Sequence, residues 1–128
     1  MTDTVSLKHI NLPVRELDRA LTFYQDVLGF AYVQHLSPTK IVLDFNGFDF
    51  FLEHDPNSRI SRYFHFGLKT TREQLFTWAD RITAHGITIM QRVQVYGLIP
   101  TPPPLQDDVA RFYFRDPDGW LIEVYHEV

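Results

Sequence analysis

The pattern of hydrophobic and polar positions predicts short strands and two helices in a repeating order. Residues 7–14 alternate as a strand, and residues 17–28 then place apolar side chains at helical spacing before Gly29. Three strand-like runs follow, at residues 30–36, 40–45 and 48–54. The last two are joined by Asn46-Gly47, a strong hairpin signal. The first part of the chain therefore has the order strand, helix, strand, strand, strand.

The same order begins again after the polar segment at residues 55–58. Residues 63–69 have strand character, and a helix is predicted from Thr71 to about His85, ended by Gly86. A strand at 87–95, a proline-rich loop at 96–108 and a hairpin at 112–126 complete the chain. We therefore expect a single α+β domain made of two βαβββ modules, at about residues 5–55 and 62–127. One such sheet cannot cover its own apolar face, so the two modules are expected to be related by a pseudo-twofold.

The C-terminal hairpin carries one carboxylate in an otherwise apolar strand. The turn sequence Asp-Pro-Asp-Gly at residues 116–119 joins two apolar runs. Strand alternation then places Glu123 on the same face as Leu121 and Tyr125. Burying a carboxylate without a partner is costly, so Glu123 lies either at a solvated rim or opposite a cation.

Two pairs of polar residues occupy similar places in the two modules. His9 and His65 lie in the first strands, 56 residues apart (65 − 9), and Glu53 and Glu123 lie near the ends of the last strands, 70 apart (123 − 53). The difference between these spacings, 14 residues (70 − 56), is about the length of the extra loop at 96–108. The four residues are therefore predicted to form two symmetry-related pairs. A lone histidine in a strand is more often a core or rim residue, but matched positions favour a functional role for these two.

Composition and charge limit the partners and metal ligands that the chain can have. The chain has 128 residues and is 45% hydrophobic, which suits one compact core. A net charge of −4 provides no broad basic surface, so nucleic acid and anionic membranes are not expected as partners. Cysteine is absent, so any metal must be held by histidine and carboxylate. No apolar run reaches membrane-spanning length and the N-terminus lacks signal-peptide features, which predicts a cytoplasmic protein.

Four segments resemble the vicinal oxygen chelate superfamily, which includes glyoxalase I, extradiol dioxygenases, methylmalonyl-CoA epimerases, and fosfomycin and bleomycin resistance proteins. They are residues 8–14 (KHINLPV), 20–30 (ALTFYQDVLGF), 64–68 (FHFGL) and the 116–119 turn followed by Glu123. In that family a cupped mixed sheet holds a divalent ion on its concave face, with ligands from the first and last strands of each half. The resemblance implies that His9, His65 and Glu123 are metal ligands, with Glu53 as a fourth ligand or a carboxylate base.

Two imidazoles and one carboxylate suit Fe²⁺, Mn²⁺, Ni²⁺, Co²⁺ or Zn²⁺ and leave coordination positions for a bidentate substrate. Such a centre can polarise a carbonyl or hold an enolate, diolate or catecholate. By strand alternation Tyr113 can face the same cavity and donate a hydrogen bond there, or it can be a packed aromatic residue. The expected function is therefore a metal-dependent enzyme of glyoxalase or dioxygenase type acting on a small oxygenated substrate, by lyase, isomerase or dioxygenase chemistry. The alternative is a binding protein that sequesters an aromatic or antibiotic ligand.

Two activities of the family fit less well. Extradiol dioxygenases have an acid–base histidine upstream of the Phe112-Tyr113 motif, whereas residues 102–106 here contain none. Fosfomycin resistance proteins have a threonine two residues after the first histidine ligand and a serine-rich potassium loop, whereas this chain has Asn11 and a proline-rich loop. Sheet edges and helix faces rich in Phe and Tyr would be exposed in a lone chain, so a homodimer with two metal sites is expected.

Overall fold

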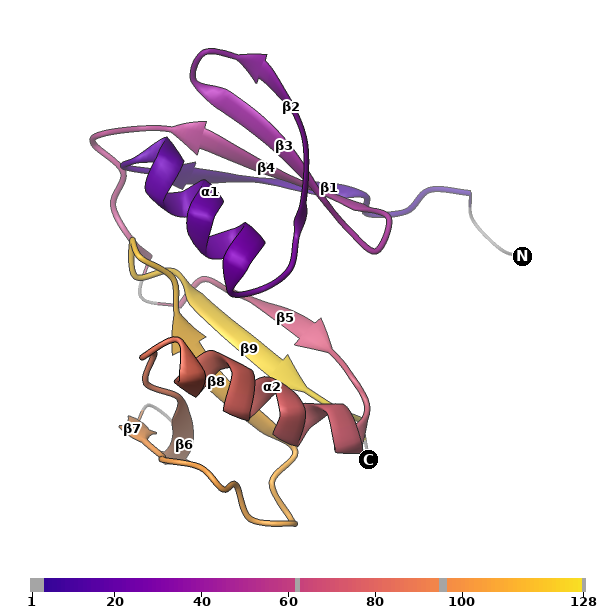
Figure 1. Cartoon of the computed structure of the whole chain (residues 1–128), viewed down its shortest axis with the longest axis vertical. Helices are drawn as coiled ribbons and strands as arrows, with labels where there is room; N and C mark the ends of the chain where they lie inside the picture. Colours follow the sequence, from indigo (N-terminus) through magenta and orange to yellow (C-terminus); the bar gives the residue numbers. More distant parts are fainter. Residues whose placement is uncertain (1–3, 62, 95–96, 128) are drawn as a thin grey trace. The chain divides into compact units, whose positions relative to one another are not determined.

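The chain divides into two compact units, Met1–Arg59 and Ile60–Val128 (Figure 1). The computed structural model describes residues 4–61, 63–94 and 97–127. Each unit has one helix and one mixed sheet, which confirms the α+β class. The first unit has the predicted βαβββ order, and the second has the same order with one added strand. Neither helix in the described part of the chain is long and apolar enough to cross a bilayer.

The first unit forms a four-stranded sheet in the order β1-β4-β3-β2. Its elements are β1 (His9–Val14), α1 (Leu17–Asp26), β2 (Ala31–Ser37), β3 (Lys40–Phe45) and β4 (Phe48–His54). Strand β1 runs parallel to β4, with His9 opposite Asp49, and the other pairs are antiparallel. The predicted hairpin at Asn46-Gly47 is confirmed, since both residues have the positive φ (51° and 88°) of a tight two-residue turn. Apolar residues of α1, among them Tyr24, are buried in the core of this unit.

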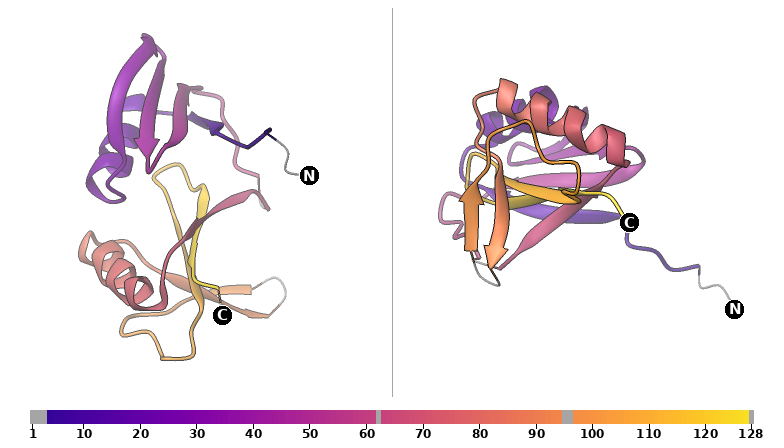
Figure 2. Two further views of the ribbon diagram at one scale, coloured as in Figure 1. Left: turned by 90° about the vertical axis from the view of Figure 1, so that its right-hand side faces the viewer. Right: turned by 90° about the horizontal axis from the view of Figure 1, so that it is seen from below.

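The second unit, coloured from pink through orange to yellow in Figure 2, forms a five-stranded sheet in the order β5-β9-β8-β6-β7. Its elements are β5 (His65–Lys69), α2 (Arg72–Ala84), β6 (Met90–Gln94), β7 (Gly97–Pro100), β8 (Arg111–Arg115) and β9 (Leu121–Tyr125). Thr71 is the N-cap of helix α2, and its hydroxyl accepts a hydrogen bond from the amide of Gln74 at 3.2 Å. Strand β5 runs parallel to β9, as β1 does to β4 in the first unit.

The prediction of an irregular loop is wrong for part of its range. Residues 97–100 form β7, which pairs antiparallel with β6 at the edge of the sheet. The proline content obscured this strand, but an edge position tolerates a residue without an N–H, such as Pro100. The end of the predicted strand at 95 and the start of the predicted loop at 96 lie outside the described residues.

The predicted C-terminal hairpin is confirmed. The Asp116 carboxylate accepts hydrogen bonds from the amides of Asp118 (2.9 Å) and Trp120 (2.8 Å), and Gly119 adopts a φ of +97°. Alternation then divides β8 and β9 into two faces. The fully buried side chains on one face form the core with α2; they are Phe112, Phe114, Ile122 and Val124. The opposite face carries polar groups, including Glu123.

Candidate metal centre

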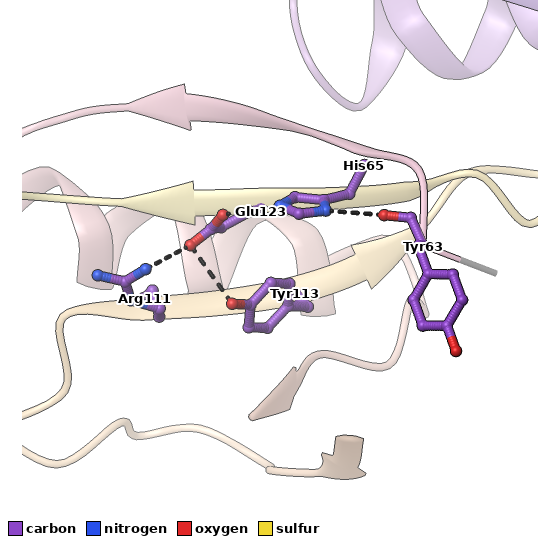
Figure 3. Close-up of polar contacts among 5 residues, drawn as sticks. All are labelled: Tyr63, His65, Arg111, Tyr113 and Glu123. Carbon is purple, nitrogen blue, oxygen red and sulfur yellow. Dashed lines mark hydrogen bonds and ion pairs between the residues drawn. The ribbon is translucent and has the colours of Figure 1, made fainter. Parts of the chain in front are cut away.

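Three strands of the second unit bring polar side chains around the carboxylate of Glu123 (Figure 3). On one side β5 places Gly67 opposite Glu123, with His65 two residues earlier on the same strand face. On the other side β8 places Tyr113 directly opposite Glu123. Arg111 lies two residues before Tyr113 and reaches Glu123 diagonally across the pair of strands.

The two oxygens of Glu123 have different neighbours. Oε2 accepts hydrogen bonds from Arg111 Nη1 at 2.9 Å and from the Tyr113 hydroxyl at 3.4 Å. Oε1 instead lies 3.5 Å from His65 Nε2. The Glu123 side chain is 10% exposed, whereas that of Arg111 is 54% exposed. The carboxylate is therefore buried, with one oxygen held by two donors and the other turned to the histidine.

The backbone assigns the tautomer of His65. Its Nδ1 lies 3.2 Å from the carbonyl oxygen of Tyr63, and a carbonyl can only accept a hydrogen bond. In the neutral imidazole, the proton is therefore on Nδ1 and the lone pair of Nε2 is directed at Glu123 Oε1. Two electron-pair donors that face each other in this way repel, and a cation between them, either a proton on Nε2 or a metal ion, removes that repulsion.

The spacing of these two atoms fits a shared divalent ion. Two ligand atoms that each lie about 2.1 Å from a tetrahedral ion are about 3.4 Å apart. The observed separation of 3.5 Å between His65 Nε2 and Glu123 Oε1 is close to this value, and it is long for a direct hydrogen bond. The pair thus offers two metal donors, and the carbonyl of Tyr63 fixes the orientation of the imidazole as in many metal sites.

Glu123 borders an open pocket of about 600 Å³. The lining residues are Gly67, Arg111, Glu123, Tyr125, His126 and Glu127. A side chain at Gly67 would intrude here, because its Cβ would lie 2.9 Å from Tyr125 Cε1 and 3.9 Å from Glu123 Oε1. The glycine in β5 therefore leaves space beside the oxygen that faces His65.

In the first unit, His9 and Glu53 project from the same sheet face but have different partners. The His9 ring lies 4.8 Å from the Phe51 ring, centroid to centroid. Glu53 Oε1 accepts a hydrogen bond from the Asn11 side-chain amide at 2.7 Å and lies 3.9 Å from Lys40 Nζ. Within the described part of each unit, no three His, Asp or Glu side chains gather into a complete metal site.

A sequence profile of one protein family matches almost the whole chain. The match extends over residues 6–124, and the family is the Glyoxalase/Bleomycin resistance protein/Dioxygenase superfamily. The chain belongs to this superfamily. The family expected from the motifs around His9, His65 and Glu123 is thereby confirmed, together with the βαβββ architecture.

Relatives within the superfamily include fosfomycin resistance proteins. Glutathione transferase FosA of Serratia marcescens is 26% identical over 125 residues, covering 94% of this chain and 79% of that protein. The structure of FosX from Listeria monocytogenes, complexed with Mn(II) and sulfate ion, has a TM-score of 0.71 and 22% identity, covering 100% of this chain and 93% of FosX. A possible glyoxalase from Bacillus cereus has a TM-score of 0.74 and 22% identity, with 95% and 99% covered. At these identities, the two structural likenesses establish the fold.

The pairing register of the parallel strands contradicts one prediction, the equivalence of Glu53 and Glu123 in the two units. In the second unit His65 pairs with Leu121, and Glu123 is two residues further along β9. In the first unit His9 pairs with Asp49, so the corresponding position on β4 is Phe51. The prediction that Glu53 and Glu123 are symmetry equivalents is therefore wrong by two residues. The spacing in the sequence could not reveal this, because it fixes the face of a strand but not its pairing.

Arg111 is the residue that the sequence analysis missed. Glu123 was expected to face a cation if it was buried, and the guanidinium of Arg111 is such a cation at 2.9 Å. The sequence could have indicated this role, because Arg111 lies two residues before Tyr113 and strand alternation places both on the face that carries Glu123. A basic residue at the start of a strand is usually a solvated charge, so this signal was weak.

Proposed function

We propose that the protein is a divalent-metal-dependent enzyme that acts on a small oxygenated substrate, with His9, His65 and Glu123 as the metal ligands. The observation that carries this proposal is the arrangement of His65 Nε2 and Glu123 Oε1, two electron-pair donors that face each other 3.5 Å apart. Histidine and carboxylate donors suit Mn²⁺, Fe²⁺, Co²⁺, Ni²⁺ or Zn²⁺. When bound, such an ion polarises a substrate oxygen and stabilises the negative charge that develops there.

Neighbouring residues orient the donor atoms of His65 and Glu123 for metal binding. The Tyr63 carbonyl holds the His65 ring so that Nε2 is available, and Arg111 Nη1 holds Oε2 so that Oε1 is turned to the histidine. The Tyr113 hydroxyl donates to Oε2 at 3.4 Å, a long hydrogen bond that can be exchanged for one to a substrate oxygen. Tyr113 is therefore proposed to bind and orient the substrate. Glu53 is outside the proposed ligand set, because the Asn11 amide engages its Oε1.

Metal analysis tests the proposal directly. Protein stripped with a chelator and resupplied with Mn²⁺, Ni²⁺ or Zn²⁺ is expected to bind one ion per chain, measured by elemental analysis after gel filtration. Protein that retains no ion after resupply would refute the metal site. Tight binding of aromatic ligands by that metal-free protein would instead indicate the alternative function, a sequestering protein.

The proposed ligands come from both units, so they can meet within one chain or across the twofold axis of a homodimer. We propose a homodimer, which sedimentation across micromolar concentrations would detect. Mixing His9→Ala protein with His65→Ala protein distinguishes the two arrangements. If each site uses two chains, random exchange of subunits restores roughly a quarter of the wild-type sites. Sites formed within one chain would not be restored.

Modification of fosfomycin is a second candidate activity. It is favoured by the 26% identity to glutathione transferase FosA over 94% of this chain. Asn11 and the prolines at 102–104 differ from the residues expected of that class and argue against this activity. Incubating the Mn²⁺-loaded protein with fosfomycin, with and without glutathione, and following the ³¹P spectrum tests this candidate. An unchanged spectrum under both conditions would eliminate it.

A further inference from the structure

A second pocket of the same unit shares Arg111 and Tyr113 with the environment of Glu123. It has a volume of about 410 Å³ and is lined by Gln91, Arg92, Val109, Ala110, Arg111 and Tyr113. Two of these side chains are guanidinium groups and none is a carboxylate. In a chain of net charge −4, a pocket lined by two cations and no anion is a local exception.

The two arginines are held by different contacts. The Arg92 guanidinium lies 5.5 Å from the centroid of the Tyr113 ring, a cation–π contact that orients its planar group. Arg111 is held by Glu123, through Nη1 at 2.9 Å from Oε2. Both residues are exposed to solvent and line the pocket. The pocket thus presents hydrogen-bond donors of fixed orientation next to the proposed metal ligand.

We propose that Arg92 and Arg111 bind an oxyanion of the substrate, a carboxylate or a phosphoryl or phosphonyl group, beside the metal. Guanidinium groups bind such oxyanions through paired N–H donors, and their charge strengthens each hydrogen bond. A divalent ion on Oε1 would draw on the negative charge of Glu123 that Arg111 now neutralises. Arg111 would then attract a second anion more strongly. This inference rests on the proposed function, because it names the substrate class of the same site.

Anion binding by the intact protein tests the inference. Inorganic phosphate and acetate are the probes, titrated by calorimetry at fixed ionic strength into metal-free and into Mn²⁺-loaded protein. Arg92→Gln and Arg111→Gln are each expected to weaken binding of the preferred anion about tenfold, since each removes a charged donor. The control is Arg115→Gln, on the same strand, whose guanidinium donates to the Gly119 carbonyl and does not line the pocket. The affinity of the Arg115→Gln variant for the preferred anion is expected to stay within about twofold of wild type.

The outcomes separate this inference from the metal proposal. Phosphate bound more tightly than acetate identifies a phosphoryl or phosphonyl substrate, the reverse order identifies a carboxylate, and loss in both pocket variants supports the inference in either case. Arg92 lies on β6 over the Tyr113 ring, and Arg92→Gln leaves the ion pair of Arg111 with Glu123 in place, so this variant keeps the test decisive if Arg111→Gln does not fold. Protein that binds Mn²⁺ but no anion, or binds anions equally in all variants, overturns the inference and leaves the metal proposal standing. Protein that binds phosphate through both arginines but binds no metal would support the anion site and refute the metal proposal.

Discussion

Replacing Glu123 with glutamine separates its role as a ligand from its role in the fold. The substitution keeps the size of the side chain and removes its charge. The ion pair with Arg111 is lost, but Arg111 is 54% exposed, so the pair contributes only about 0.2–1 kcal/mol. The substitution also removes the unfavourable burial of a carboxylate that is 10% exposed, which offsets part of this loss. The free energy of unfolding of the metal-free protein should therefore change by less than about 1 kcal/mol.

Metal affinity should respond much more strongly. Losing a residue that merely orients a ligand weakens metal binding by about 10–100-fold, so losing the charged ligand itself should weaken it by at least about 100-fold. Mn²⁺ at 100 times the wild-type Kd stabilises wild-type protein by about 2.7 kcal/mol, but a variant with 100-fold weaker binding by only about 0.4 kcal/mol. For a chain of 128 residues these values correspond to increases in Tm of roughly 10 °C and 1–2 °C.

Thermal denaturation with and without Mn²⁺ measures both effects. The matched control is Glu127→Gln. Glu127 lines the same pocket and pairs with Lys69 Nζ at 3.0 Å, but it is 68% exposed and lies outside the proposed ligand set. That variant should retain the wild-type increase in Tm. If Glu123→Gln also retains it, Glu123 is not a metal ligand. If Glu123→Gln is unfolded without metal, the carboxylate is a structural residue and the estimate of its contribution to stability is wrong.

Four further substitutions, two of them a matched pair of glycines, test the site and the fold. His65→Ala should abolish Mn²⁺ binding in calorimetry and leave the far-UV circular dichroism spectrum unchanged, because the His65 side chain is 40% exposed; loss of cooperative unfolding would instead mark a structural residue. Thr71→Ala removes the hydroxyl that accepts the hydrogen bond at the start of α2 and should lower the free energy of unfolding by about 1 kcal/mol, measured with urea. Gly119→Ala should destabilise more than Gly47→Ala by about 0.5–1.5 kcal/mol, the cost of moving one side chain off its preferred rotamer. Both glycines have positive φ, but only at Gly119 would a Cβ meet another side chain, Ile60 Cδ1 at 2.6 Å; equal losses would show that this contact relaxes freely.

Local features of the sequence were sufficient to predict most elements of the fold. The turns at 46–47 and 116–119 depend on residues adjacent in the chain, and both form the predicted hairpins. The two helices follow from apolar spacing within one segment each. The strand at 97–100 was missed because its stability comes from pairing with β6, and its own composition resembles a loop.

The candidate site depended more on tertiary structure. The motifs around His65 and Glu123 identified both residues, because strand alternation assigns each side chain to a face. Alternation cannot assign the register between strands that are distant in the sequence. Only the pairing of β5 with β9 placed His65 Nε2 opposite Glu123 Oε1, and only the pairing of β8 with β9 brought Arg111 to Oε2. For the same reason the pairing of β1 with β4, and not the spacing of the two modules, placed Phe51 where the sequence had predicted Glu53.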